Sequence, residues 1–155
     1  MKAYDGKQIE VVVEDGKELV LHGPAVAIVA IDEDDTVTFV RQKRVGAHGK
    51  LLEIPAGNVE DGEEPLATAQ RELREETGLR GGDWTEVARV YSSPGFCDER
   101  VHIFLARGVT HGDASPEGSE DIELVRVPVA EIEGLIPEVE DAKTLAGLLL
   151  YLRLR

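Results

Sequence analysis

The sequence predicts a mixed α/β fold, because β-rich apolar runs and helical segments follow one another along a chain of 155 residues. This length suits one domain with a single sizeable core, and the chain shows no internal repeat or interdomain linker. A fully apolar run at Ala25–Ile31 indicates a central strand covered on both faces. An acidic segment at Glu64–Thr77 indicates a helix with a charged flank.

The N-terminal region, residues 1–23, predicts a β-hairpin. Ile9–Glu14 and Glu18–His22 alternate between apolar and polar residues, and the pair Asp15-Gly16 lies between them. Because both positions of such a pair accept positive φ, they favour the tight turn of a hairpin.

The remaining elements follow in order. Thr36–Gln42 continues the sheet after Ala25–Ile31, and Leu51–Gly57 leads a strand into a turn. Further β-rich and periodic runs predict strands at Trp84–Tyr91, Val101–Ala106 and Ile122–Val127, and helices at Val129–Gly134 and Ala142–Leu154. Thr110–Ser119 is rich in glycine, serine and proline without an apolar period, which predicts an exposed, mobile loop.

The composition of the chain argues against several classes of function. The net charge of −14 argues against long nucleic acid, because such binding depends on lysine and arginine neutralising phosphates. No apolar run reaches the roughly 20 residues of a membrane-spanning helix, and the N-terminus lacks the apolar core of a secretory signal, so we expect a cytoplasmic protein. An anionic small-molecule substrate would need local positive charge from arginines or bound divalent cations. Cys97 is the single cysteine and precedes two acids, so we expect it to pack in a loop rather than to act as a nucleophile.

The segment Glu64–Thr77 gives the strongest helix prediction. Pro65 suits the first helical position, and Gly78 suits the C-terminal cap. One face should pack on the core, and it consists of Leu66, Ala69, Leu73 and Thr77.

Three glutamates, Glu72, Glu75 and Glu76, fan out beside that face, since residues three and four apart are neighbours on a helix. Like charges at this spacing destabilise a helix by roughly 0.2–0.5 kcal/mol per pair, and a broken local rule often marks function. Arg71 and Arg74 can offset the repulsion, so a solvated charged face is the alternative. Carboxylates together with carbonyl oxygens from the upstream turn suit Mg²⁺.

The spacing of these residues matches a known motif. Five residues separate Gly57 from Glu63, seven separate Glu63 from Arg71, and the run Arg71-Glu72-Leu73-Arg74-Glu75-Glu76-Thr77-Gly78-Leu79 follows. The pattern resembles the Nudix box at every fixed position. This resemblance implies an α/β/α sandwich around a mixed β-sheet, with the box forming a loop, a helix and a loop.

The resemblance also implies roles for the box residues. Glu72, Glu76 and the carbonyl of Ala56 would bind the metal, and Glu75 would assist directly or through water. Arg71 would hold a glutamate in place, and Glu63 would support the loop. The expected ion is Mg²⁺, with Mn²⁺ as a substitute.

Outside the box, Val40–Arg44, Leu52–Gly57 and Ser93–Phe96 are similar to the ADP-ribose pyrophosphatase branch, in which a proline is typical at the position of Pro94. This similarity implies hydrolysis of ADP-ribose to AMP and ribose 5-phosphate, by in-line attack of a metal-activated water on one phosphorus. Other nucleoside diphosphate sugars could use the same frame.

Five residues are candidates for substrate binding: Arg41, Arg44, Glu53, Pro94 and Phe96. The two arginines could donate to phosphate or to the terminal ribose, and Phe96 could stack on a base. Each has an alternative, because arginines near a strand end are often only solvated and Phe96 could lie in the core.

The resemblance further implies a general base and a homodimer. In the related branch the base is a glutamate on a loop before a strand, and Glu120 matches it best, with Glu117 and Glu123 as alternatives. An N-terminal extension in related enzymes helps to form the dimer, so we expect residues 1–23 to do so here.

Two other functions remain open: a Nudix hydrolase acting on an oxidised nucleoside triphosphate or a dinucleoside polyphosphate, and a non-catalytic nucleotide-sensing domain. The intact glutamate set argues against the sensor.

Overall fold

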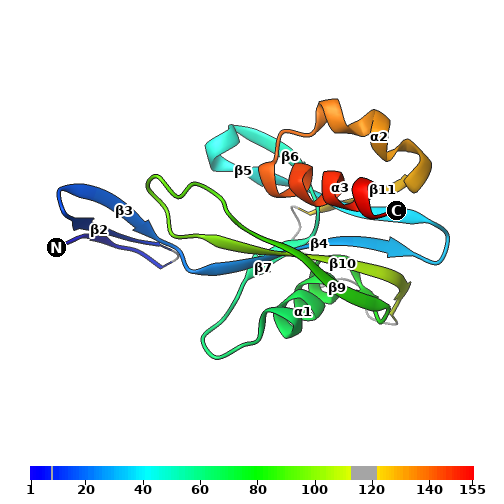
Figure 1. Ribbon diagram of the computed structural model, residues 1–155, viewed down its shortest axis with the longest axis horizontal. Helices are drawn as coiled ribbons and strands as arrows, with labels where there is room; N and C mark the ends of the chain where they lie inside the picture. Colours follow the sequence, from blue (N-terminus) through cyan, green and yellow to red (C-terminus); the bar gives the residue numbers. More distant parts are fainter. Residues whose placement is uncertain (8, 113–121) are drawn as a thin grey trace.

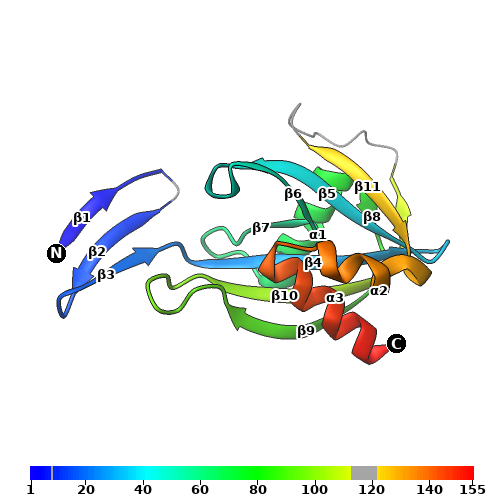
Figure 2. The same cartoon turned by 90° about the horizontal axis from the view of Figure 1, so that it is seen from above.

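The computed structural model describes residues 1–7, 9–112 and 122–155. A small antiparallel sheet at the N-terminus extends from a larger part in which a mixed sheet lies between helices (Figure 1, Figure 2). The small sheet has the order β1-β2-β3 and consists of β1 (Lys2–Asp5), β2 (Glu10–Glu14) and β3 (Lys17–Leu21).

The predicted N-terminal hairpin is confirmed, and one further strand joins it. Asp15 (φ 50°) and Gly16 (φ 76°) form the turn between β2 and β3, as the sequence pair predicts. The added strand β1 pairs with β2, and all four of its residues are exposed. Without a buried face it has no apolar alternation, so no period in the sequence marks it.

The large sheet has the order β11-β5-β4-β10-β8, with β6 beside β5, β7 beside β4 and β9 beside β10. The pair β4 and β10 is parallel and the other pairs are antiparallel, so the sheet is mixed as predicted. Its strands are β4 (Pro24–Asp32), β5 (Thr36–Arg44), β6 (Gly49–Glu53), β7 (Ala56–Asn58), β8 (Leu79–Arg80), β9 (Asp83–Tyr91), β10 (Arg100–His111) and β11 (Glu123–Pro128).

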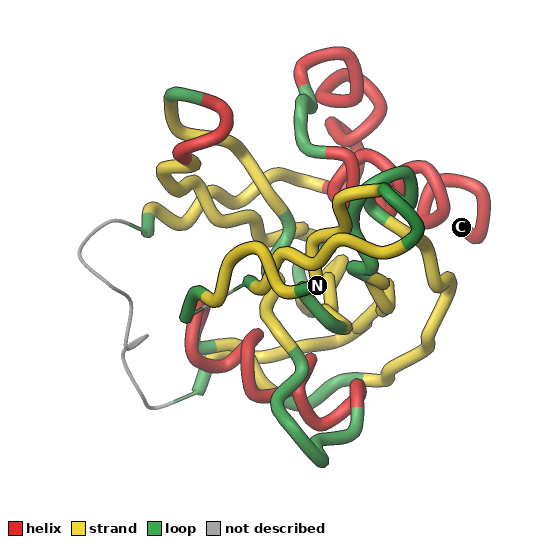
Figure 3. The backbone as a smooth tube through the Cα atoms, turned by 90° about the vertical axis from the view of Figure 1, so that its left-hand side faces the viewer, coloured by secondary structure: helices red, strands yellow, loops and turns green. Residues whose placement is uncertain are grey.

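Helices cover both faces of this sheet (Figure 1, Figure 3). On one face, Ala27 and Val29 of β4 pack in a core with Leu148 of α3 (Ala142–Leu154). On the other face, Val26 and Ile28 pack with Leu73 of α1 (Pro65–Thr77). The apolar run is therefore buried on both sides, and the predicted α/β/α sandwich is confirmed.

Three details differ from the sequence prediction. Leu66 of α1 is 42% exposed, and Thr68 takes its place on the buried face because the apolar stripe is rotated toward Thr68, Ala69 and Leu73. Strand β10 continues to His111 because Thr110 and His111 pair with β8, so the start of the predicted loop is a strand. Residues 113–119 of that loop lie outside the described residues.

The predicted helix Val129–Gly134 is also shorter than expected. The α-helix α2 covers Ile132–Leu135, between 3₁₀ turns at Val129–Glu131 and Ile136–Glu138. Only Ile132 is buried in this stretch, and Pro137 follows closely, so little packing supports a longer regular helix. None of the described helices is long and apolar enough to cross a membrane.

Candidate active site

A cavity of about 480 Å³ lies where α1, α3 and the ends of several strands meet. Its walls combine the N-terminal segment, the large sheet and both long helices. The lining residues are Ile9, His22, Ala25, Val26, Gln42, Arg44, Ala56, Gly57, Asn58, Glu76, Ser92, Glu99, Val101, Asp141, Ala142 and Lys143. The Nudix-like helix and its upstream turn therefore share this cavity with cations from β5 and α3.

Arg71 organises the acidic flank of α1. Its guanidinium donates two hydrogen bonds to Glu63, both at 3.1 Å, one to Glu72 at 2.7 Å and one to Glu75 at 3.1 Å. The bonds from Arg71 lower the pKa of Glu63 to about 2. One arginine thus joins the loop before α1 to two glutamates of the helix and offsets their mutual repulsion.

Gly57 lets the turn approach the helix closely. A Cβ at this position would lie 2.1 Å from the carboxyl carbon of Glu72, so the Glu72 carboxylate would have to move away from the turn. Burial raises the pKa of Glu72, against the opposing effect of its bond from Arg71. The glycine of the box therefore leaves room for the carboxylate of Glu72, the first of the predicted metal ligands.

Glu76 lies at the cavity wall and is partly buried. The backbone N–H of Ala56 donates to its Oε2 at 3.1 Å, which ties the turn to the last part of α1. Burial raises the pKa of Glu76 to about 7, and the charges of Glu72 and Glu53 add to the shift while the Ala56 N–H and Arg44 oppose it. The site therefore holds more negative charge than the protein itself compensates.

The donor set fits a hard divalent cation by its chemistry. Glu72, Glu75 and Glu76 supply carboxylate oxygens from one flank of α1, and Gly57 brings the backbone to that flank. Across residues 1–7, 9–112 and 122–155, no three acidic, histidine or cysteine side chains already converge on one point. Two of the three carboxylates instead face Arg71, so binding an ion would require their side chains to rotate.

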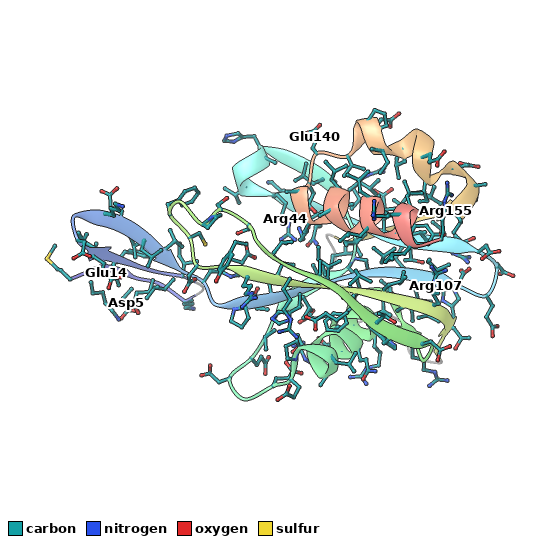
Figure 4. The ribbon with its side chains drawn as sticks, viewed as in Figure 1. Asp5, Glu14, Arg44, Arg107, Glu140 and Arg155 are labelled. Atoms are coloured by element: carbon teal, nitrogen blue, oxygen red, sulfur yellow. The ribbon has the colours of Figure 1, made fainter. Side chains whose placement is uncertain are left out.

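Glu53 lies behind the cavity wall and is satisfied by two cations. Arg44 donates to both of its oxygens, at 2.6 and 2.8 Å, and Lys143 donates to Oε2 at 2.7 Å. Burial of Glu53 acts to raise its pKa, but these bonds outweigh that effect and hold the pKa below its usual value. The structure thus pairs Glu53 with Arg44, and of these two residues Arg44 lines the cavity while Glu53 does not. The label of Arg44 lies beside the amino end of α3 (Figure 4).

Lys143 and Asp141 also line the cavity, and the sequence reasoning did not select them. Asp141 is the N-cap of α3 and accepts a hydrogen bond from the Thr144 backbone at 2.9 Å. An aspartate immediately before a predicted helix is a recognised capping signal, which would have marked this position. Nothing in the sequence marks Lys143, because its partner Glu53 lies 90 residues away.

Arg41 is not brought to this cavity. Its guanidinium donates to Glu123 of β11 at 3.1 Å, and it lines a separate cavity of about 260 Å³. Side chains alternate along β5, so Gln42 and Arg44 face the first cavity while Arg41 faces away. Glu123, an alternative for the base, is engaged with Arg41, and Glu117 and Glu120 lie outside the described residues.

The loop between β9 and β10 carries Pro94 and Phe96 beside the N-terminal sheet (Figure 1). The Val20 N–H of β3 donates to the Phe96 carbonyl at 2.7 Å, and the Asp98 N–H donates back to the Val20 carbonyl at 3.1 Å. Phe96 is 58% exposed, so it is not a core residue, and its ring is accessible to a ligand. Cys97 is partly buried in this loop, as expected of a packed residue.

A sequence model of the NUDIX domain matches residues 21–147. The chain belongs to the Nudix family. It is thus a Nudix hydrolase, and its family uses divalent metal ions.

Individual relatives carry different names. This Nudix chain is 40% identical to the ADP-ribose pyrophosphatase of Bacillus subtilis, over 98% of the chain and 89% of the relative. It is 35% identical to the methanol dehydrogenase activator of Bacillus methanolicus, over 90% of the chain and 77% of the relative. It is 34% identical to the GDP-mannose pyrophosphatase of Citrobacter koseri, over 72% of the chain and 64% of the relative.

A solved structure supports the fold. The crystal structure of an ADP compounds hydrolase superposes with a TM-score of 0.81 and 23% identity, covering 99% of this chain and 90% of that one. The N-terminal sheet and the Nudix sandwich together therefore follow a known arrangement.

Proposed function

We propose that this Nudix hydrolase cleaves the pyrophosphate bond of ADP-ribose to AMP and ribose 5-phosphate in the presence of Mg²⁺. The carrying observation is the cavity that contains Glu76 of the acidic flank together with Arg44 and Lys143. Such a site offers oxygen ligands to a cation and positive charge to the phosphates of one substrate. The Bacillus subtilis relative, named ADP-ribose pyrophosphatase, supports the choice of substrate.

The acidic flank would hold the metal. Glu72, Glu76 and the Ala56 carbonyl are the proposed ligands, with Glu75 acting directly or through water. When bound, a divalent ion neutralises developing charge on the phosphates and lowers the pKa of an attacking water. Arg71 keeps Glu72 and Glu75 on the same flank of α1. We expect Mn²⁺ to substitute for Mg²⁺.

Other residues would bind the substrate and accept the proton. Arg44 lines the cavity and can donate to a phosphate while its other donors hold Glu53. The exposed ring of Phe96 offers a stacking surface for a base. Glu120 remains the proposed general base, with Glu117 as an alternative.

The N-terminal sheet supports the further proposal of a homodimer. Met1 is 86% exposed and Tyr4 is 57% exposed on this sheet, which leaves apolar side chains available to a second copy. One chain has a mass of 16.9 kDa. Size-exclusion chromatography with light scattering should give twice this mass. A mass of one chain at micromolar concentration would contradict this expectation.

A substrate panel tests the proposed activity. We expect the highest kcat/KM for ADP-ribose, with AMP as product, and a requirement for Mg²⁺. GDP-mannose is the second candidate because of the relative of that name. Oxidised nucleoside triphosphates and dinucleoside polyphosphates complete the panel, and a clear preference for one of these would contradict the proposal. Hydrolysis in ¹⁸O water, followed by mass analysis of both products, identifies the phosphorus that is attacked.

A further inference from the structure

The amino end of α3 is joined to the chain just before the metal-site turn. The Asp141 carboxylate accepts from the Thr144 hydroxyl at 2.6 Å, and the Thr144 oxygen in turn accepts from the Ile54 N–H at 2.9 Å. Thr144 is fully buried, so this relay is shielded from water. The N-cap of α3 therefore fixes the backbone of Ile54.

A second link holds the preceding residue. Lys143 donates to Glu53 at 2.7 Å and to Asp141 at 2.8 Å, and the side chain of Glu53 is 1% exposed. Two consecutive residues of the chain, Glu53 and Ile54, are thus both bound by consecutive residues of α3. One is bound through its side chain and the other through its backbone.

These anchors lie immediately before the residues that meet α1. The Pro55 carbonyl accepts from Ile28 of the central strand at 2.8 Å, the Ala56 N–H donates to Glu76, and Gly57 contacts Glu72. Proline has a fixed φ, which limits the rotation that could absorb a displacement at Ile54 before it reaches Ala56. The separation between the turn and the glutamates of α1 therefore depends on where α3 holds Ile54.

We infer that Thr144 and Lys143 are positioning residues, through which the amino end of α3 holds the Ile54–Gly57 turn against Glu72 and Glu76 in the geometry that binds the metal. The inference rests on the metal site of the proposed function. The glutamates of α1 alone would not predict that α3 positions the metal-site turn. Groups that orient a metal ligand from behind typically affect metal affinity by about 10–100-fold. Thr144 acts through one backbone bond, so we expect an effect of about tenfold, at the low end of that range.

Thr144→Val is the primary test. Valine keeps the shape of threonine but removes the hydroxyl, so the Ile54 N–H loses its acceptor. We expect the Kd for Mn²⁺, measured by electron paramagnetic resonance of the free ion well below the unfolding temperature, to rise about tenfold. The Mg²⁺ concentration for half-maximal hydrolysis should rise in parallel. Thr144→Ser keeps the hydroxyl and should restore an affinity close to that of the parent.

Thr38→Val is the matched control. Thr38 is also a buried threonine, on β5, and its hydroxyl has no hydrogen-bond partner within the described part of the chain. The same chemical change there should leave the Mn²⁺ affinity unchanged. An equal loss of affinity in Thr38→Val would overturn the inference, because the effect would then be a general response of the core.

A lowered Tm in Thr144→Val with the Mn²⁺ affinity of the parent would also overturn it, since Thr144 would then only stabilise the fold. If Thr144→Val does not fold, Lys143→Met decides, with Lys50→Met as its control on the second cavity. We expect weaker Mn²⁺ binding in Lys143→Met and unchanged binding in Lys50→Met. Unchanged binding in Lys143→Met would refute the positioning role.

Failure of the proposed function gives a different result. A parent that binds Mn²⁺ but does not hydrolyse ADP-ribose would contradict the substrate, while a loss of Mn²⁺ affinity in Thr144→Val would still support the positioning role. A parent that binds no Mn²⁺ would overturn both.

Discussion

Glu53 and Glu76 lie close to the same cavity, and the protein treats their charges in opposite ways. Glu53 receives three hydrogen bonds from Arg44 and Lys143, and its pKa is held below the usual value despite its burial. Glu76 accepts a hydrogen bond from the backbone N–H of Ala56 and has no cation bonded to it within the described residues, and its burial raises its pKa to about 7. The two carboxylates differ in the partners that the fold provides.

This difference separates a structural carboxylate from one that is suited to a ligand. A buried charge is tolerated when cations and hydrogen bonds compensate it, as at Glu53. A charged carboxylate that lacks such compensation destabilises the folded state unless a cation binds to it. Glu76 meets this description, and a divalent cation would supply the missing charge.

The largest expected effect is on catalysis by Glu76→Gln. Removing a proposed metal ligand should cost several kcal/mol of transition-state stabilisation, and about 4 kcal/mol corresponds to a loss of about 10³ in kcat. Steady-state release of AMP from ADP-ribose measures it. Glu14→Gln, on the exposed turn side of β2, makes the same chemical change and should keep full activity. Turnover within a few fold of the parent in Glu76→Gln would remove the contrast between the two glutamates.

The second effect is the stabilisation of the parent by metal. An ion that binds only the folded state stabilises it by about 2.7 kcal/mol at 100 times its Kd, which raises Tm by about 5–10 °C in a chain of this size. We expect this shift with Mg²⁺ after treatment with a chelator, and a much smaller shift in Glu76→Gln. Differential scanning calorimetry measures both. Equal shifts in the two proteins would place the ion elsewhere.

The third effect is on stability in Glu53→Gln. Removing one partner of a fully buried ion pair costs about 3–5 kcal/mol, but Arg44 is 43% exposed and can regain water, so we expect about 2 kcal/mol. This change corresponds to a fall of about 4–8 °C in Tm. Urea unfolding gives the free energy directly. Glu76→Gln in chelator should instead be at least as stable as the parent, so a loss of similar size there would contradict the comparison.

The smallest effect is the dependence of stability on pH. The raised pKa of Glu76 gives metal-free protein a stabilising contribution that is full below its unfolded value of 4.5 and is lost as pH rises toward about 7. Glu53 has the opposite sign, because its stabilising contribution is present above 4.5 and is lost as pH falls through its lower folded pKa. Since one pKa unit is about 1.4 kcal/mol, we expect the free energy of unfolding to change by on the order of 1 kcal/mol per pH unit within each window. Unfolding of each Gln variant, followed from pH 8 down to well below 4.5, should flatten only its own part of the curve.

Local sequence signals predicted most of the fold. Local signals are the Asp15-Gly16 pair, the apolar run of β4, Pro65 at the first position of α1 and Gly78 at its C-cap. Each acts within a few residues, and the structure confirms all of them. Strands β1, β7 and β8 were missed because they are short and exist through pairing with distant partners. A two-residue strand such as β8 carries no period that a sequence can show.

The site was predictable only in part, for the same reason. Helical spacing alone places Glu72, Glu75 and Glu76 on one flank. By contrast, the pairing of Glu53 with Lys143 joins β6 to α3, and the binding of Arg41 to Glu123 joins β5 to β11. Such contacts depend on the complete topology, so no local pattern in the sequence predicts the protein partners of Glu53 and Arg41.

The bonds between the N-terminal region and the β9–β10 loop have a consequence for N-terminally shortened variants of this protein. One carboxylate oxygen of Asp98 accepts the N–H groups of His22 and Gly23, at 2.7 and 3.1 Å, and Ile9 and His22 form part of the cavity wall. A shortened chain that starts at the family match, residue 21, would lose Ile9 and the strand that holds Phe96. The first twenty residues thus contribute Ile9 to the wall of the candidate site, and a chain without them would lack that part of the wall.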